Sequence, residues 1–223
     1  MQDQSTTLGW RDGRVPVSTR FDDPYFSLDN GLDETRHVFL TGNDLPARFR
    51  DGFHVAELGF GTGLNLLATW SAWRQARVSG RLHFTSFEAF PMALSDMETA
   101  VRAFPEVETL AATLLSALRA GGPEYDLGEV MLTLITGDAR TTLPDWQGMA
   151  DAWFLDGFSP AKNPELWGQS LMAEVGRHTV NGGTAATYTA AGHVRRGLEA
   201  GGFAVARVPG FGRKRHMTKA TRR

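Results

Sequence analysis

Short apolar runs alternate with amphipathic stretches along most of this 223-residue chain. The apolar runs, bounded by glycine and polar residues, predict strands at residues 53–58, 82–87, 130–135, 150–155, 183–187, 203–208 and 216–221. Helical periodicity between them predicts helices at residues 64–76, 92–104, 107–120, 164–178 and 190–200. Alternation of this kind predicts an α/β fold, doubly wound around a mostly parallel seven-stranded sheet.

The amino-terminal part of the chain does not follow this alternation. Residues 10–18 predict a hairpin that turns at Asp12 and Gly13, a pair typical of tight turns between strands. Residues 21–27 and 31–36 combine polar and aromatic side chains. They are compatible with a cap that shapes a pocket over the sheet, and equally with an extension that only covers its edge.

Three glycines at alternate positions, Gly59, Gly61 and Gly63, follow the first predicted strand and precede its helix. Glycine gives such a loop open backbone angles and lets a ligand approach the main chain. Nucleotide-binding folds of many kinds share this signal, and some examples are plain turns. The dinucleotide fingerprint leaves two residues before its last glycine, whereas only Thr62 stands there in this chain. Glu57 suits the amino end of S-adenosylmethionine and would repel a pyrophosphate, so a methyl-donor site is favoured.

Acidic residues stand at or just past four predicted strand ends, at Glu57, Glu88, Asp138 and Asp156. Glu88 is placed to accept hydrogen bonds from both hydroxyls of a ribose, a feature that nicotinamide enzymes share. Asp138 can accept a hydrogen bond from an adenine amino group. Each of these residues is also a candidate helix cap.

Asp156 begins the segment that follows the fourth predicted strand and carries the candidate chemistry. Methyl transfer to an amine needs an unprotonated nitrogen in line with the sulfonium carbon, and positive charge builds on that nitrogen. A fixed carboxylate can orient the amine, stabilise the developing charge and accept the surplus proton. This chemistry requires no metal.

The composition is that of an ordinary globular protein, with 42% hydrophobic and 22% charged residues. We expect residues 1–50 to form an N-terminal cap extension and residues 51–223 to form the α/β domain, within one globular unit. There is no cysteine, which excludes disulfides and thiolate metal sites, and the six histidines are too scattered to predict a metal. No apolar run is long enough to span a membrane and the first residues are not typical of a secretory signal, so we expect a cytoplasmic protein.

Charge is unevenly distributed, although the formal net charge is only −2. Residues 190–223 contain nine Lys or Arg against one acid, Glu199. A basic end on an acidic body predicts a polyanionic partner at one face, although a solvated tail has the same composition.

Five segments together resemble the methyltransferase half of the bacterial MnmC family, which modifies the wobble uridine of tRNA. These are residues 21–27, 57–65, 156–164, 187–192 with 194–196, and 209–215. The resemblance extends from about residue 10 to residue 220, and the segments that begin at residues 156 and 209 are more specific than the glycine loop. It implies a Rossmann-like S-adenosylmethionine-dependent methyltransferase fold. It also implies methyl transfer to the aminomethyl nitrogen of 5-aminomethyl(-2-thio)uridine in the anticodon region of tRNA.

The resemblance also implies roles for particular residues. Cofactor contacts are expected from Glu57, Gly59, Phe60, Gly61, Gly63, Asn65, Glu88, Asp138 and Ala139, with Asp156 as the catalytic residue facing the amine. Contacts with tRNA are expected from Phe158, Lys162, Tyr188, Arg195, Arg196, Phe211, Arg213, Lys214 and Arg215. Among the latter, the basic residues would contact phosphates and the aromatic ones would stack on an unstacked base.

One departure from the family concerns a second activity. In the fused bacterial enzymes a flavin-dependent oxidoreductase domain follows, whereas this sequence ends at Arg223 without a second glycine fingerprint. We therefore expect no flavin here, and leave open whether the methyltransferase is free-standing or part of a longer protein. The alternatives are an N-methyltransferase of a small-molecule or protein amine, a nicotinamide oxidoreductase, and a nucleic-acid-binding module without catalysis. The sequence does not indicate an oligomeric state.

Overall fold

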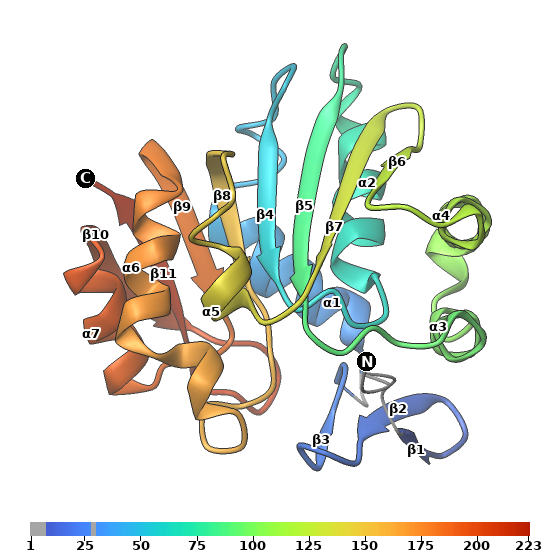
Figure 1. Ribbon diagram of the computed structural model, residues 1–223, viewed down its shortest axis with the longest axis horizontal. Coiled ribbons are helices and arrows are strands. Elements are labelled where there is room, and N and C mark those ends of the chain that lie inside the picture. The colour runs from blue at the N-terminus through green and yellow to red at the C-terminus, as the bar shows by residue number, and fades with distance from the viewer. Residues whose placement is uncertain (1–7, 28–29) are drawn as a thin grey trace.

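The computed structural model describes residues 8–27 and 30–223, which form a twisted sheet with helices on both faces and a small second sheet (Figure 1). The main sheet has eight strands in the order β10-β11-β9-β8-β4-β5-β7-β6. Its strands are β4 (His54–Leu58), β5 (Leu82–Glu88), β6 (Glu124–Asp126), β7 (Val130–Thr136), β8 (Ala150–Leu155), β9 (Thr179–Thr187), β10 (Phe203–Pro209) and β11 (His216–Arg222). The small sheet joins β1 (Leu8–Arg11), β2 (Val15–Ser18) and β3 (Asp23–Pro24).

The central strands of the main sheet are parallel. The pairings β9-β8, β8-β4, β4-β5 and β5-β7 are parallel, whereas β11, β10 and β6 add to the edges in antiparallel orientation. The expected α/β fold is therefore confirmed. Parallel strands end at the same edge of a sheet, so the loops after β4, β5, β7, β8 and β9 gather there.

Two layers of helices cover the faces of the sheet (Figure 1). The α-helices are α1 (Gly31–Thr35), α2 (Leu64–Ala76), α3 (Leu94–Val101), α4 (Glu108–Ala120), α5 (Ala139–Thr142), α6 (Gln169–Arg177) and α7 (Gly192–Ala200). Shorter π or 3-10 turns are η1 (Arg36–Leu40), η2 (Thr41–Asn43), η3 (Pro105–Val107) and η4 (Pro164–Trp167).

Strand β8 shows why the central strands are apolar throughout. Its Ala152 and Phe154 belong to the core that α2 and α4 cover, whereas Trp153 and Leu155 belong to the core that α6 and α7 cover. All four side chains are fully buried. A strand covered on both faces has no polar side to alternate, so it appears in the sequence as a continuous apolar run.

The main sheet has eight strands where the sequence predicts seven, because β6 was not predicted. Its three residues, Glu124, Tyr125 and Asp126, pair with β7 but are polar and mostly exposed. A strand this short and this polar carries no periodicity that a sequence can reveal.

Two predicted helices are also shorter than expected. The helix predicted over residues 164–178 divides into η4 and α6 at Gly168, whose ψ of 150° is extended. The helix predicted over residues 92–104 is confined to α3, and η3 with Pro105 near its start separates it from α4.

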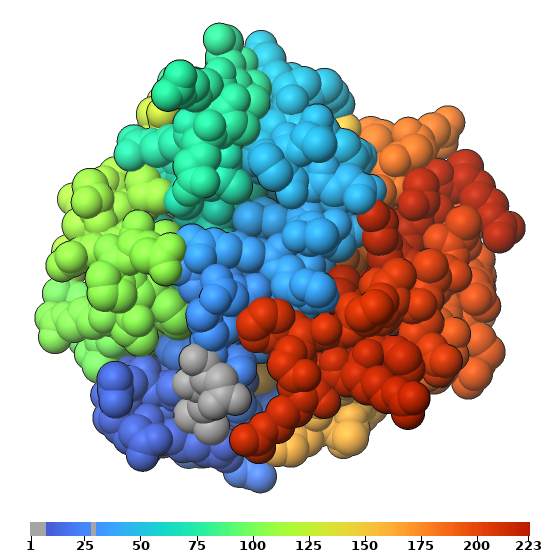
Figure 2. Space-filling model, turned by 180° about the vertical axis from the view of Figure 1, so that it is seen from behind, coloured from blue at the N-terminus to red at the C-terminus, as the bar shows by residue number. Residues whose placement is uncertain are grey.

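The amino-terminal segment has two different parts. The predicted hairpin is confirmed, since β1 and β2 pair and both Asp12 and Gly13 have positive φ. The second part, from α1 to η2, instead packs Leu32, Val38 and Phe39 into the core beside α2. Figure 2 shows this part in blue on the rear face, with the C-terminal strands in red beside it. The boundary that we expect at residue 50 stays a prediction.

The described part of the chain contains no candidate for a membrane-spanning helix. None of the helices there combines the length and the apolar character that crossing a bilayer requires.

Candidate functional site

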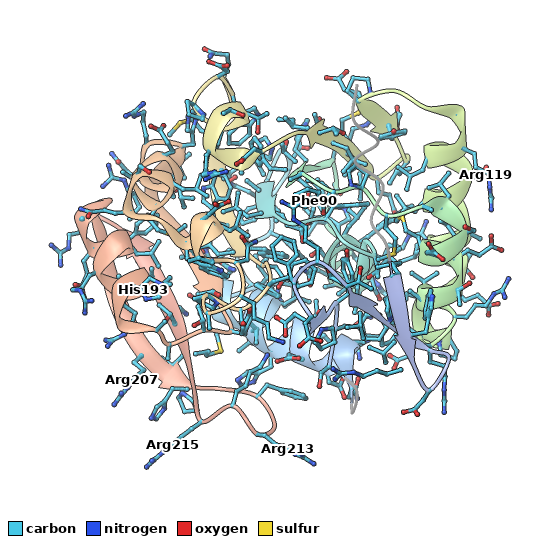
Figure 3. All side chains as sticks on the ribbon, turned by 60° about the horizontal axis from the view of Figure 1, so that its bottom comes forward. Phe90, Arg119, His193, Arg207, Arg213 and Arg215 are labelled. Carbon is cyan, nitrogen blue, oxygen red and sulfur yellow. The ribbon has the colours of Figure 1, made fainter. Side chains whose placement is uncertain are left out.

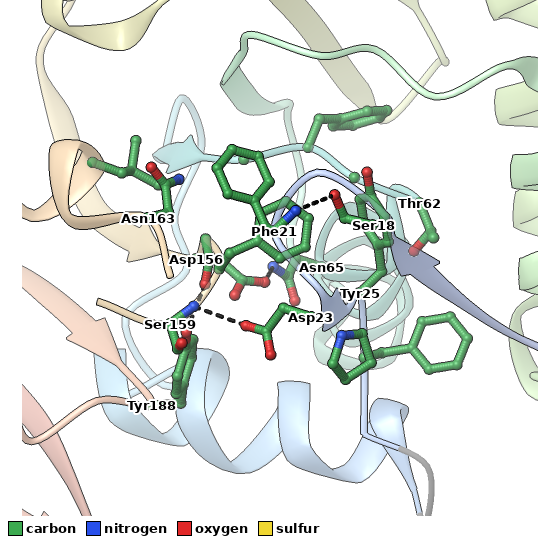
Figure 4. A pocket seen from close by; sticks show the side chains of 18 of the residues that line it. Ser18, Phe21, Asp23, Tyr25, Thr62, Asn65, Asp156, Ser159, Asn163 and Tyr188 are labelled. Atoms are coloured by element: carbon green, nitrogen blue, oxygen red, sulfur yellow. Dashed lines mark hydrogen bonds between the residues drawn. The ribbon is translucent and has the colours of Figure 1, made fainter. Parts of the chain in front are cut away.

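A cleft of about 1060 Å³ opens at the edge where the parallel strands end. Its walls come from the loops after β4, β5, β7, β8 and β9, from the amino-terminal segment and from the β10-β11 loop. Figure 4 shows part of this lining at close range. Among the residues expected at the site, the cleft is lined by Gly59, Phe60, Gly61, Asn65, Glu88, Asp138, Ala139, Asp156, Phe158, Tyr188, Phe211, Arg213 and Lys214.

The glycine loop brings the end of β4 against the end of β8. Gly59 has a φ of 91°, and a Cβ atom there would collide with the carbonyl oxygen of Asp156. Gly61 and its neighbours line the cleft, so ligands can reach this backbone. Gly63 does not line it: its φ of 77° starts α2, and a Cβ atom would crowd Leu114 and Phe60. Gly63 therefore has a packing role, and its expected cofactor contact stays a prediction.

Asn65 connects two carboxyl groups below the cleft. Its Nδ2 donates to Oε1 of Glu57 at 2.8 Å and to Oδ2 of Asp156 at 2.7 Å. Its Oδ1 accepts from Oγ1 of Thr35 at 2.9 Å, which fixes the orientation of the amide. The second carboxyl oxygen of Glu57 accepts from Oγ of Ser86 at 2.6 Å. The Asn65 side chain therefore holds Asp156 in place at the floor of the cleft.

Direct contact between Glu57 and a cofactor, which the sequence predicts, is not supported. The Glu57 side chain is fully buried and does not line the cleft. Burial, opposed by the hydrogen bonds from Ser86 and Asn65, raises the pKa of Glu57 to about 8. Glu57 acts on the cleft through Asn65.

Glu88 lines the cleft at the end of β5. Its carboxyl oxygens accept from the backbone N–H of Gly61 at 3.0 Å and from that of Phe90 at 2.7 Å. Burial raises the pKa of Glu88 above its ordinary value, against the lowering effect of these backbone donors. Each carboxyl oxygen keeps a further lone pair for a ligand hydroxyl.

Asp138 lines the cleft and also caps α5, while its contact with adenine stays a prediction. Its Oδ1 accepts from the backbone N–H of Arg140 at 2.9 Å, and the Arg140 guanidinium pairs with the same carboxylate. The hydrogen bond from the Arg140 side chain is the main cause that lowers the pKa of Asp138. The neighbouring Ala139 is buried at the wall of the cleft.

Asp156 is the acidic group best suited to proton transfer. Burial raises its pKa to about 7, while the Asn65 hydrogen bond and the Lys214 charge lower it and the Glu34 charge raises it. A carboxyl group with a pKa near neutrality can accept a proton from an amine and release it to water within one turnover.

The amino-terminal strands form a lid, residues 15–26, that is fastened to the loop after β8. The backbone N–H of Ser159 donates to Oδ2 of Asp23 at 2.9 Å. Lys162 donates to the backbone carbonyl of Asp22 and pairs with Oδ1 of Asp23 at 3.5 Å. Lys162 does not line the cleft and attaches the lid, and its expected role in tRNA binding stays a prediction.

Aromatic side chains from the lid and from the strand-end loops meet across the cleft. The rings of Phe21 and Phe158 are stacked with centroids 4.7 Å apart, and the Tyr25 ring meets Phe158 edge-on at 5.1 Å. The Arg20 guanidinium lies 4.3 Å from the centroid of Phe90. One face of Phe158 is therefore already covered by the protein, which restricts its expected stacking on a base.

The other two candidate stacking residues have mainly structural contacts. The Tyr188 hydroxyl donates to the carbonyl of Gly157 at 2.6 Å, and Nζ of Lys214 lies 4.0 Å above its ring. Burial raises the pKa of Tyr188 above its ordinary value, so the phenol stays protonated. The Phe211 ring packs beside His37, with centroids 5.8 Å apart.

The basic residues near the carboxyl terminus do not form a single cluster. Arg213 lies at the rim of the cleft, whereas Arg215 is exposed outside it, and Figure 3 shows both side chains projecting away from the molecule at the tip of the β10-β11 loop. Arg195 and Arg196 are on α7 and do not line the cleft. Lys214 points inward, where it pairs with Glu34.

For several residues of the site, the sequence does not indicate the particular contact that the structure shows. Glu34 and Thr35 on α1, Asp23 in the lid and Ser86 on β5 act through partners far away along the chain. Asp23 pairs with a residue 136 positions away, and Glu34 with one 180 positions away. In the described ranges, 8–27 and 30–223, no group of three or more potential metal ligands is close enough to hold an ion.

Comparison with known proteins gives a consistent family. A family model described as S-adenosyl-L-methionine-dependent methyltransferase, Methyltransf_30, matches residues 105–223. The chain is 48% identical to the "tRNA 5-methylaminomethyl-2-thiouridine biosynthesis bifunctional protein MnmC" of Ectopseudomonas mendocina, an alignment that covers 94% of this chain and 34% of the relative. The protein of the same name from Vibrio cholerae is 47% identical with the same coverage. The chain thus spans about a third of the length of the curated relatives it matches.

Solved structures support the same relationship. The crystal structure of MnmC2 from Aquifex aeolicus superposes with a TM-score of 0.80 at 25% identity, covering 100% of this chain and 71% of that one. A precorrin-6y C5,15-methyltransferase from Geobacter metallireducens has a TM-score of 0.52 at 14% identity over 96% of this chain and 98% of its own, which shows a shared fold only.

Proposed function

The chain belongs to the S-adenosyl-L-methionine-dependent methyltransferase family, and from that premise we propose that it methylates the aminomethyl nitrogen of 5-aminomethyl(-2-thio)uridine at the wobble position of tRNA. The observation that carries the proposal is the position of Asp156, at the end of β8 beside the glycine loop and held by Asn65. Similarity to bifunctional proteins named for tRNA 5-methylaminomethyl-2-thiouridine biosynthesis supports this acceptor.

We expect S-adenosylmethionine to lie across the strand ends. Its ribose would bind Glu88, and its adenine would lie beside Asp138 and Ala139. Its amino-acid part would run along the glycine loop towards Asn65. The burial of Glu88 in the cleft wall and the exposed backbone of Gly61 support this orientation.

The proposed reaction begins when Asp156 accepts a proton from the substrate ammonium, so that the amine nitrogen regains its lone pair. The nitrogen then attacks the methyl carbon of the sulfonium. A C–N bond forms, the S–CH3 bond breaks, and its electron pair stays on sulfur as S-adenosylhomocysteine. The product is a secondary ammonium, and Asp156 returns its proton to water. Oxidation states do not change, so the step calls for no flavin, and because Asp156 supplies the base it calls for no metal.

The substrate would approach from the face that carries the lid and the β10-β11 loop. Arg213 and Arg215 at the tip of that loop are exposed and suited to phosphate contacts. Arg195 and Arg196 on α7 would extend these contacts. A tRNA substrate implies that the protein works in the cytoplasm.

Methyl transfer to defined tRNA tests this proposal. The protein is incubated with S-adenosylmethionine and tRNA that carries 5-aminomethyl-2-thiouridine, and anticodon nucleosides are analysed by mass spectrometry. The expected product is heavier by one CH2 unit, because a methyl group replaces a hydrogen on nitrogen, and tRNA with unmodified uridine should show no change in mass. Methyl transfer to free amines or protein amines but not to this tRNA would favour the alternative acceptor, and calorimetric binding of NAD in place of S-adenosylhomocysteine would refute both.

A further inference from the structure

Lys214 differs from its basic neighbours on the β10-β11 loop, although sequence alone groups the three. The loop closes with a turn in which the Lys214 N–H donates to the Phe211 carbonyl at 2.9 Å and Gly212 has a φ of 56°. This turn directs the Lys214 side chain back over the cleft, while Arg213 and Arg215 project outward (Figure 3).

Two groups from different elements meet at the Lys214 ammonium. Its Nζ donates to Oε1 of Glu34 on α1 at 2.7 Å and lies 4.0 Å above the centroid of Tyr188, which follows β9. The Glu34 side chain is 14% exposed and the Lys214 side chain 46%, so the carboxylate end of the ion pair is the end shielded from water. The Lys214 ammonium therefore already has a carboxylate and an aromatic face as partners on the cleft side of the loop.

We propose that Lys214 is a positioning residue for methyl transfer rather than a phosphate contact: it fastens the β10-β11 loop over the cleft and supplies a positive charge to the cleft that Asp156 also lines. This inference rests on the proposed function, since it concerns the proton that Asp156 accepts. Asp156 must be a carboxylate when the substrate ammonium arrives, and a nearby cation favours both the carboxylate and the uncharged amine.

Other charged and titratable groups face Asp156 as well. Glu57 lies on β4 and shares Asn65 with it, Glu34 faces it from α1, and Tyr188 faces it from the end of β9. The Lys214 charge lowers the pKa of Asp156 and the Glu34 charge raises it. Lys214 is the cation among these groups, so its removal leaves Asp156 facing carboxyl groups and a phenol.

The test compares Lys214→Met with Arg215→Met, which removes the same charge from the outward-facing side of the loop. Single-turnover rates at saturating cofactor and tRNA are measured from pH 5.5 to pH 9. On the acidic side of the pH–rate profile, which we call the acidic limb, the rate rises to half its maximum at a particular pH. We expect Lys214→Met to raise this pH by about half to one unit and Lys214→Arg to restore the wild-type value. Glu34→Gln should move the limb downward. Arg215→Met should weaken tRNA binding and leave the limb in place.

A second readout does not depend on turnover. Carboxyl-13C aspartate NMR, with Asp156→Asn to assign the signal, follows the titration of Asp156 with S-adenosylhomocysteine present. Its midpoint should shift upward in Lys214→Met and stay unchanged in Arg215→Met. If neither the limb nor the midpoint moves in Lys214→Met, or if this variant only weakens tRNA binding as Arg215→Met does, the inference is wrong. A wild-type protein that titrates as expected but leaves tRNA unmethylated would refute the proposed function alone.

Discussion

The cofactor wall of the cleft and its lid are built in different ways. The cofactor wall consists of short loops after β4, β5 and β7, where Gly61, Glu88 and Asp138 are placed by the parallel sheet itself. The lid and the β10-β11 loop are instead held by a few side-chain contacts between distant residues, such as Asp23 with Ser159 and Lys214 with Glu34. The wall is a property of the fold. The lid and the β10-β11 loop, which together form the closure of the cleft, depend instead on individual polar contacts.

The largest effect is expected where wall and closure meet, at Asp156. Asp156→Asn keeps the shape and the Asn65 neighbour but cannot accept a proton, so methyl transfer should fall by about 10²–10⁴-fold. Affinity for S-adenosylhomocysteine should stay nearly unchanged, because the wall is intact. In the wild type the rate should rise with pH through about 7, as the carboxylate forms. If the variant turned over within a few-fold of the wild-type rate, Asp156 would not be the proton acceptor.

The wall itself is tested by Gly59→Ala. The new methyl group would collide with the Asp156 carbonyl at a φ of 91°, which costs about 1–3 kcal/mol of folding free energy. Denaturant unfolding measures this loss, and calorimetry should show weaker cofactor binding. Gly52→Ala is the matched control, since Gly52 has a φ of 68° with open space around it. Equal effects of the two substitutions would mean that the approach of β4 to β8 is not what Gly59 provides.

The closure is tested by Asp23→Ala. This change removes the hydrogen bond from Ser159 and the pairing with Lys162, so the lid should loosen and cofactor affinity should fall about threefold to tenfold. Proteolysis within residues 8–27 should become faster while global stability changes little. Asp22→Asn is the control, because it keeps both the backbone carbonyl to which Lys162 donates and a side-chain oxygen near the Lys162 ammonium. An unchanged affinity would separate the lid from the cofactor.

The smallest effect concerns the buried support of the wall. Because the pKa of Glu57 is raised to about 8 in the folded protein, its contribution to stability is complete at low pH and is lost as pH rises through about 8. Glu57→Gln should therefore flatten the fall in melting temperature between pH 5 and pH 9. Glu124→Gln, at an exposed site on β6, should leave the profile unchanged. A profile for Glu57→Gln as steep as that of the wild type would contradict the raised pKa.

The same contrast explains what sequence could predict. The strands, the glycine loop and the places of Glu88 and Asp138 follow from local patterns, because the sheet converts a position at a strand end into a position at the cleft. The burial of Glu57 could not be predicted. A carboxyl group two residues before the first glycine fits the motif equally well whether it points into the cleft or into the protein interior. Lys162 and Lys214 look like surface cations until folding brings Asp23 and Glu34 beside them.

The orientation of the cofactor is the central claim, and a crystal structure with S-adenosylhomocysteine tests it most directly. The account predicts ribose hydroxyls on Glu88, adenine beside Asp138 and Ala139, and the sulfur directed towards Asp156 beneath the lid. A nucleoside bound elsewhere, or a sulfur that points away from Asp156, would contradict it.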